Sequence, residues 1–148
     1  MTAVDLDAYL ARIGYDGPLE PTLDVLSALQ LAHLTHIPFS TVDALFFPPT
    51  PLSLADIETK LVHDRGGGYC LEHHLLFATV LETLGFQVTM HLSHVRNGGP
   101  VARPRGIPRP HLVLLVELAG CQWLTDVSFG GGVLQPMRLR AGETVNQF

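Results

Sequence analysis

The spacing of apolar residues divides the chain into two parts. Up to about residue 85, apolar residues recur every three or four positions, which is the period of an amphipathic helix. This pattern predicts four helices, at about residues 6–13, 23–33, 54–61 and 70–84. The expected N-terminal caps of the first three helices are Asp5, Thr22 and Ser53, and Gly85 is expected to end the fourth.

From residue 86 onward the sequence contains the β-branched and aromatic runs that are typical of strands. Strands are predicted within residues 86–95, 111–118 and 121–127. A fourth run, residues 133–140, contains a proline and is expected at an edge or a bulge. Because the second run is apolar throughout its middle, that strand is expected inside the sheet.

These elements predict an α+β fold, in which a helical part precedes antiparallel strands. The helical part is expected at residues 1–85 and the β part at residues 86–148. Three or four strands are few for a closed barrel, and they would leave unpaired edges. We therefore expect the β part to be incomplete, with self-association or a completing polypeptide covering the edges.

The composition narrows the class of protein. Hydrophobic residues make up 47% of the chain and charged residues 16%, which is typical of a globular protein. A formal net charge of −5 argues against nucleic acid as the main partner, because phosphate binding needs a basic surface. Neither a membrane-spanning run nor the basic start of a signal peptide is found. We expect a cytoplasmic protein in which Cys70 and Cys121 are free thiols.

Cys70 is the first candidate for chemistry, because it follows three glycines and Tyr69 and opens a predicted helix. A thiol at a helix N-terminus lies near the positive end of the peptide dipoles, which favours the reactive thiolate. The alternative is a buried structural cysteine beside a flexible turn, and for a cysteine alone this alternative is the commoner case.

His111 and Asp126 strengthen the catalytic interpretation. His111 starts a predicted strand, and Asp126 ends the next one. If a short turn at residues 119–120 joins the two strands as antiparallel neighbours, both side chains lie at the same end of the sheet. The carboxylate then accepts from one imidazole nitrogen while the other faces Cys70, which makes a Cys-His-Asp triad.

At this point the sequence resembles the arylamine N-acetyltransferase family. RGGGYCLEHHLLF resembles its cysteine motif, HLTHIPFSTVD its upstream Ile-Pro-Phe segment, and HLVLLV and LTDVSFGGG its histidine and aspartate motifs, in the same order. The resemblance implies a helical bundle at residues 1–85 followed by an antiparallel β-barrel at residues 86–148, with a papain-like cysteine core. It also implies a xenobiotic-metabolising acyltransferase. By a ping-pong mechanism, Cys70 would take the acetyl group of acetyl-CoA, and an arylamine or hydrazine would then accept it.

The chain departs from the resembled family at several positions. Gly66 stands in place of the usual Arg, Ser40 and Thr41 in place of Glu-Asn, and His74 in place of Asn. The lost Arg and Glu have opposite charges, and we infer that they pair in relatives. The family also continues past this length and adds a third domain that helps to bind coenzyme A, so the chain is expected to be a fragment, a truncated product or half of a split enzyme.

The remaining signals are weaker. The candidate substrate or cofactor-binding residues are Phe39, Tyr69, Phe129, Gly130 and Gly131. The aromatic residues would line an acceptor pocket, with core packing as the alternative for Phe39, and the glycines would meet a pyrophosphate. No metal is expected, since adjacent helical residues such as His73 and His74 point in different directions. Two other functions stay open: a cysteine hydrolase or amide synthase of papain or transglutaminase type, and an inactive remnant.

Overall fold

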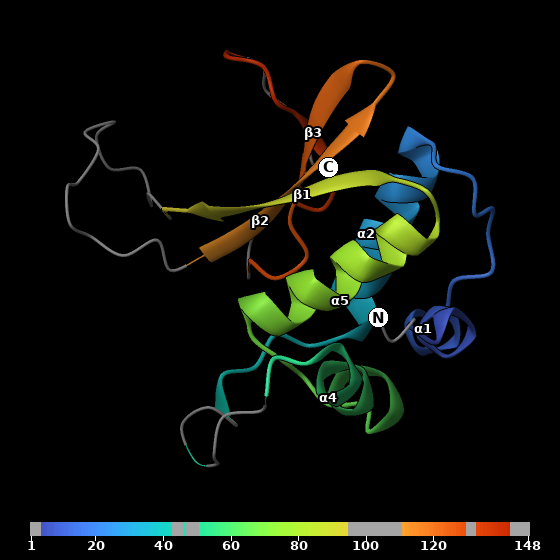
Figure 1. Cartoon of the computed structure of the whole chain (residues 1–148), viewed down its shortest axis with the longest axis vertical. Helices are drawn as coiled ribbons and strands as arrows, with labels where there is room; N and C mark the ends of the chain where they lie inside the picture. The colour runs from blue at the N-terminus through green and yellow to red at the C-terminus, as the bar shows by residue number, and fades with distance from the viewer. Residues whose placement is uncertain (1–3, 43–45, 47–50, 95–110, 130–132, 143–148) are drawn as a thin grey trace.

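The structure is a computed structural model, and it describes residues 4–42, 46, 51–94, 111–129 and 133–142. The helices are α1 (Leu6–Ile13), α2 (Leu23–His36), α4 (Leu54–Glu58), the π-helical turn η1 (Thr59–His63) and α5 (Cys70–Thr83). The strands are β1 (Gln87–Ser93), β2 (His111–Leu118), β3 (Cys121–Thr125) and β4 (Met137–Arg138). The predicted order of helices followed by strands is confirmed (Figure 1).

The three predicted N-terminal caps are confirmed. Asp5 Oδ1 accepts from Ala8 N at 3.0 Å, Thr22 Oγ1 from Val25 N at 3.3 Å and Ser53 Oγ from Asp56 N at 3.2 Å. The third predicted helix differs in form, because it changes from α to π geometry after Glu58. Its last turn closes with Asp64 N donating to Thr59 O at 2.8 Å, and this wider turn leads directly into the loop before Cys70.

The four strands form one antiparallel sheet in the order β1-β2-β3-β4. A two-residue turn joins β2 to β3, with Ala119 and Gly120 at φ 50° and 71°, so the predicted tight hairpin is confirmed. Its register pairs Leu114 with Thr125, which brings the start of β2 and the end of β3 to the same end of the sheet. Among the described residues these strands form a sheet, and the predicted barrel is not seen.

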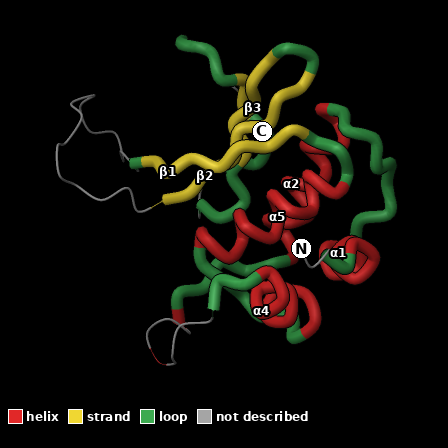
Figure 2. Tube along the Cα trace, viewed as in Figure 1, coloured by secondary structure: helices red, strands yellow, loops and turns green. Residues whose placement is uncertain are grey.

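Helix α5 lies between the sheet and the other helices (Figures 1 and 2). It contacts β1 and β2 on one side and α4 on the other. The core contains Leu76, Phe77 and Leu81 from α5, together with Leu114 and Val116 from β2. Consecutive residues at the start of β2 point to opposite faces of the sheet, and all of them are buried. This burial on both faces confirms the predicted inner strand. In the described part of the chain, no helix combines the length and apolar character needed to cross a membrane.

Candidate active site

Cys70 is the first residue of α5, and its side chain is partly exposed. The glycines before it are required by close approach. A Cβ atom on Gly67 would lie 2.6 Å from the carbonyl oxygen of Pro38, and one on Gly66 would lie 2.9 Å from that of Lys60. Both neighbours are backbone atoms, so a side chain at either position would displace the loop. The arginine usual in the resembled family has no room at position 66 in this loop.

The upstream Ile-Pro-Phe segment lies directly against this loop. Ser40 N donates to Gly68 O at 2.7 Å, and Gly68 N donates to Pro38 O at 3.2 Å. Phe39 and Gly68 thereby form a parallel bridge, although they are far apart in sequence. The two motifs therefore form one structural unit around Cys70.

A buried ion pair also supports the cysteine loop. The carboxylate of Glu72, which is 0% exposed, lies 2.9 Å from Lys60 Nζ. Its Oε2 also accepts from Tyr69 N at 3.0 Å, which caps the first turn of α5. Sequence reasoning did not find this pair. Lys60 is the only lysine in the sequence, but nothing in the apolar pattern indicates that a residue of η1 reaches α5.

His111 and Asp126 are brought together as predicted. His111 Nε2 lies 2.7 Å from Asp126 Oδ2, and both side chains are largely buried. Burial alone would raise the pKa of Asp126, but the hydrogen bonds from His74, His111 and Ser128 N outweigh it and lower that pKa. The carboxylate is therefore ionised at neutral pH and accepts from His111 Nε2–H. The other ring nitrogen of His111, Nδ1, is left to act as a base.

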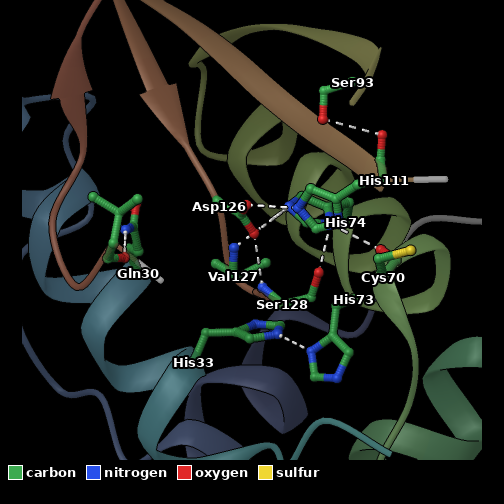
Figure 3. A network of polar contacts seen from close by, with 11 residues as sticks. Gln30, His33, Cys70, His73, His74, Ser93, His111, Asp126, Val127 and Ser128 are labelled. Carbon is green, nitrogen blue, oxygen red and sulfur yellow. Dashed lines mark hydrogen bonds and ion pairs between the residues drawn. The ribbon is translucent and has the colours of Figure 1, made fainter. Parts of the chain in front are cut away.

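Figure 3 shows His74, His111 and Asp126 gathered in one cluster, with Cys70 beside them and joined to His74 through its backbone carbonyl. The ring of His74 meets that of His111 edge to face, with 5.7 Å between centroids, and its Nδ1 lies 2.8 Å from Cys70 O. Sequence reasoning considered His74 as a replacement for Asn and as a metal ligand, and it missed this contact. The available signal was its position four residues after Cys70, which places it on the same face of the helix.

A second buried chain of hydrogen bonds reaches the cysteine loop from behind α5. Tyr9 Oη lies 2.8 Å from His33 Nδ1, His33 Nε2 lies 2.8 Å from His73 Nδ1, and His73 Nε2 lies 3.1 Å from Gly68 O. Since a carbonyl only accepts, His73 must donate from Nε2 and accept at Nδ1. His33 then donates to His73 and accepts from the tyrosine, so both imidazoles are neutral.

This neutral pair makes stability depend on pH. Burial is the main cause that lowers the pKa of His73 to about 4 and that of His33 well below its usual value. The unfolded chain binds protons at both histidines near pH 6.5, whereas the folded chain does not. The contribution of the two neutral histidines to the free energy of unfolding is thus complete above pH 6.5 and is lost as the pH falls toward 4. For His73 alone this loss is about 3 kcal/mol.

We expect urea unfolding to show this loss between pH 6.5 and 4.5. His73→Gln should flatten the pH dependence, because an amide takes up no proton, and His91→Gln on the exposed face of β1 should leave it unchanged. A stability that stays constant across this range in the parent chain would contradict the assignment.

The aromatic candidates lie around the cluster. Phe39 is 50% exposed and stacks on His73 at 6.4 Å, so it is not a core residue. Phe129 meets His111 edge to face at 5.4 Å, and Tyr69 occupies the position just before α5 and is partly exposed. Gly130 and Gly131 lie outside the described residues. Among residues that are described, no group of three or more His, Cys, Asp or Glu side chains is arranged to hold a metal ion.

Because Cys121 falls within a predicted strand, the sequence also predicts that it is a small buried hydrophobic residue, and this prediction is wrong. It starts β3, is partly exposed, and its sulfur accepts from Arg138 Nη2 at 3.0 Å. A hairpin end leaves the first strand residue open to solvent, which an apolar run in the sequence does not reveal. We still expect iodoacetamide to alkylate Cys70 faster than Cys121 at pH 7, because Cys70 also has a helix N-terminus and an imidazole cluster nearby. Peptide mass spectrometry on the native protein measures both rates, and equal rates would contradict the prediction.

Most of the chain is similar to known proteins in sequence and in structure. A family model described as N-acetyltransferase matches residues 22–148. An arylamine N-acetyltransferase of Escherichia coli (strain K12) is 43% identical over 135 residues, covering 90% of this chain and 47% of that protein. The structure of the arylamine N-acetyltransferase from Mycobacterium abscessus matches with a TM-score of 0.87 and 39% identity, over 97% of this chain and 49% of that one. The Mycobacterium marinum enzyme in complex with CoA matches with a TM-score of 0.84 and 42% identity, over 97% of this chain and 54% of that one. The chain spans about half the length of the curated relatives it matches.

Proposed function

The chain belongs to the arylamine N-acetyltransferase family, and we propose that it moves an acetyl group from acetyl-CoA to an arylamine or hydrazine through a thioester on Cys70. The observation that carries this proposal is the 2.7 Å contact between His111 Nε2 and Asp126 Oδ2, in the same cluster as a cysteine that opens α5.

The acetylation half-reaction uses this arrangement directly. His111 takes the Sγ proton at Nδ1, and the imidazolium that results is stabilised by Asp126. The Cys70 thiolate attacks the acetyl carbonyl carbon, and the C–S bond to coenzyme A breaks as the new thioester forms. The departing thiolate of coenzyme A receives the proton back from His111.

The transfer half-reaction runs the same steps toward the amine. The amine nitrogen attacks the thioester carbonyl of acetyl-Cys70, and His111 removes a proton from that nitrogen. The C–S bond to Cys70 breaks, and the sulfur leaves as a thiolate or takes the proton from His111. We propose that Phe39, Tyr69 and Phe129 bound the aromatic acceptor. The half-exposed ring of Phe39 and the positions of Tyr69 next to Cys70 and of Phe129 against His111 support this proposal.

We extend the proposal to the domain organisation, the coenzyme A site and the location of the protein. Residues 1–85 and 86–148 are proposed as a helical domain and a barrel domain, with the described sheet as part of the barrel. Gly130 and Gly131 are proposed to contact the pyrophosphate of coenzyme A, and a relative solved in complex with CoA supports that cofactor as co-substrate. A cytoplasmic location remains part of the proposal.

The test is mass spectrometry of the intact protein and its peptides after incubation with acetyl-CoA. We expect one added acetyl group on Cys70, none in Cys70→Ser, and loss of the group when an arylamine is added, with formation of the acetylated amine. A parent protein that gains no acetyl group on Cys70 would contradict the proposal. An adduct that water removes as fast as the amine does would instead indicate a hydrolase.

A further inference from the structure

The side chain of His74 contacts both Cys70 and the segment that follows β3. Its side chain is fully buried, on the face of α5 that carries Cys70. Nδ1 lies 2.8 Å from Cys70 O and 3.2 Å from Ser128 Oγ. Nε2 lies 3.3 Å from Asp126 Oδ1 and 3.4 Å from Val127 N. The ring therefore connects the helix that carries the cysteine to the segment that follows β3.

We propose that His74 is a positioning residue, which holds the Asp126 carboxylate so that Oδ2 faces His111. This inference rests on the proposed function, because it assigns His74 a part in the same site. His111 occupies Oδ2, while Oδ1 is shared by His74 Nε2 and by Ser128 N, which donates at 3.0 Å. With contacts at both oxygens, the carboxylate cannot turn away from His111 without losing hydrogen bonds.

The proton on His74 follows from its partners. Cys70 O only accepts, so Nδ1 carries a hydrogen. Nε2 then accepts from Val127 N in the neutral ring, or donates to Asp126 Oδ1 when it also binds a proton. The proposed role requires the second state, in which Nε2–H donates to Asp126 Oδ1 and holds the carboxylate directly. An apolar side chain makes neither contact. In the described part of the chain, the titratable groups that surround His74 are Cys70, Asp126, His111, His33 and His73.

The proposal predicts a change in the reactivity of the cysteine. When Asp126 is held less firmly, the His111 imidazolium is less stabilised, and this weakens its support for the Cys70 thiolate. The loss of one hydrogen bond to a charged group corresponds to about tenfold in an equilibrium. His74→Leu should therefore slow alkylation of Cys70 by about tenfold at pH 7 and move its pH profile to higher pH.

The experiment follows iodoacetamide alkylation of Cys70 against pH, by peptide mass spectrometry, in His74→Leu and His74→Asn. The asparagine amide still donates to the Cys70 carbonyl and stays polar toward Asp126, so this variant should recover most of the parent profile. His91→Leu is the matched control, because it makes the same change at an exposed histidine. A folded His74→Leu protein with the parent profile would overturn the proposal.

Two further measurements make the result decisive. If His74→Leu does not fold, as judged by circular dichroism, the ¹⁵N shifts of His74 in the parent protein decide, assigned by their loss in His74→Asn. A hydrogen on Nε2, the nitrogen that faces Asp126 Oδ1, supports the proposal, and a bare Nε2 overturns it. Alkylation needs no acetyl-CoA, so a parent protein that gains no acetyl group but shows the shift in His74→Leu would refute the proposed function and leave the role of His74 intact.

Discussion

Replacing Asp126 with asparagine should lower acetyl transfer by about 10⁴-fold while the fold is retained, by analogy with the same change in serine-protease triads. The carboxylate now accepts from His111 Nε2–H at 2.7 Å. An amide nitrogen at that position donates instead, so His111 is pushed to carry its hydrogen on Nδ1. That nitrogen then has no lone pair with which to take the thiol proton, and the thiolate does not form.

The measurement is single-turnover acetylation of Cys70 by acetyl-CoA, with acetyl transfer to an arylamine in parallel. Asp16→Asn is the matched control, since it changes an exposed carboxylate in the turn after α1. Circular dichroism and thermal unfolding show whether the variant is folded. Acetylation within a few-fold of the parent rate would mean that Asp126 does not orient His111.

The pairing of His111 with Asp126 could be predicted because it depends on local features alone. Two strands joined by a two-residue turn have a fixed register, so residues at the open end must meet. The helices could be predicted for a similar reason, because caps and apolar spacing act within a few residues. The π turn after Glu58 could not, since a change from α to π geometry leaves the apolar spacing almost unaltered.

The contacts of His74 and Lys60 could not be predicted, because each joins elements whose packing the sequence does not specify. In the sequence, His74 stood out as a replacement for Asn and as one of two adjacent histidines. Those two do point in different directions: His73 toward His33 and His74 toward Asp126. The Arg and Glu that we inferred to pair in relatives are both absent from this chain, so the sequence predicts no ion pair near Cys70. The structure shows Lys60 paired with Glu72 in that loop region, so an ion pair is present that the sequence did not predict.

That ion pair leads to the largest effect expected on stability. Lys60→Met should lower the free energy of unfolding by about 3–5 kcal/mol, because it leaves the Glu72 carboxylate buried without its cation. Glu72 is 0% exposed, and Lys60 Nζ lies 2.9 Å from Oε1 and 3.2 Å from Oε2. Tyr69 N still donates to Oε2, but one neutral donor offsets only part of the cost of a buried charge.

The double variant Lys60→Met with Glu72→Gln separates the charge from the packing. A glutamine oxygen can still accept from Tyr69 N, and no ion then remains buried, so this variant should be more stable than Lys60→Met alone. Urea unfolding at pH 7 measures the stability of both variants. Arg140→Met is the control for loss of an exposed cation, and it should change stability by about 0.5 kcal/mol or less.

If the single and double variants are equally stable, the buried carboxylate does not depend on Lys60. If the single variant alone also slows alkylation of Cys70, the pair holds the cysteine loop as well as the fold, because Glu72 caps the helix turn on which that cysteine lies.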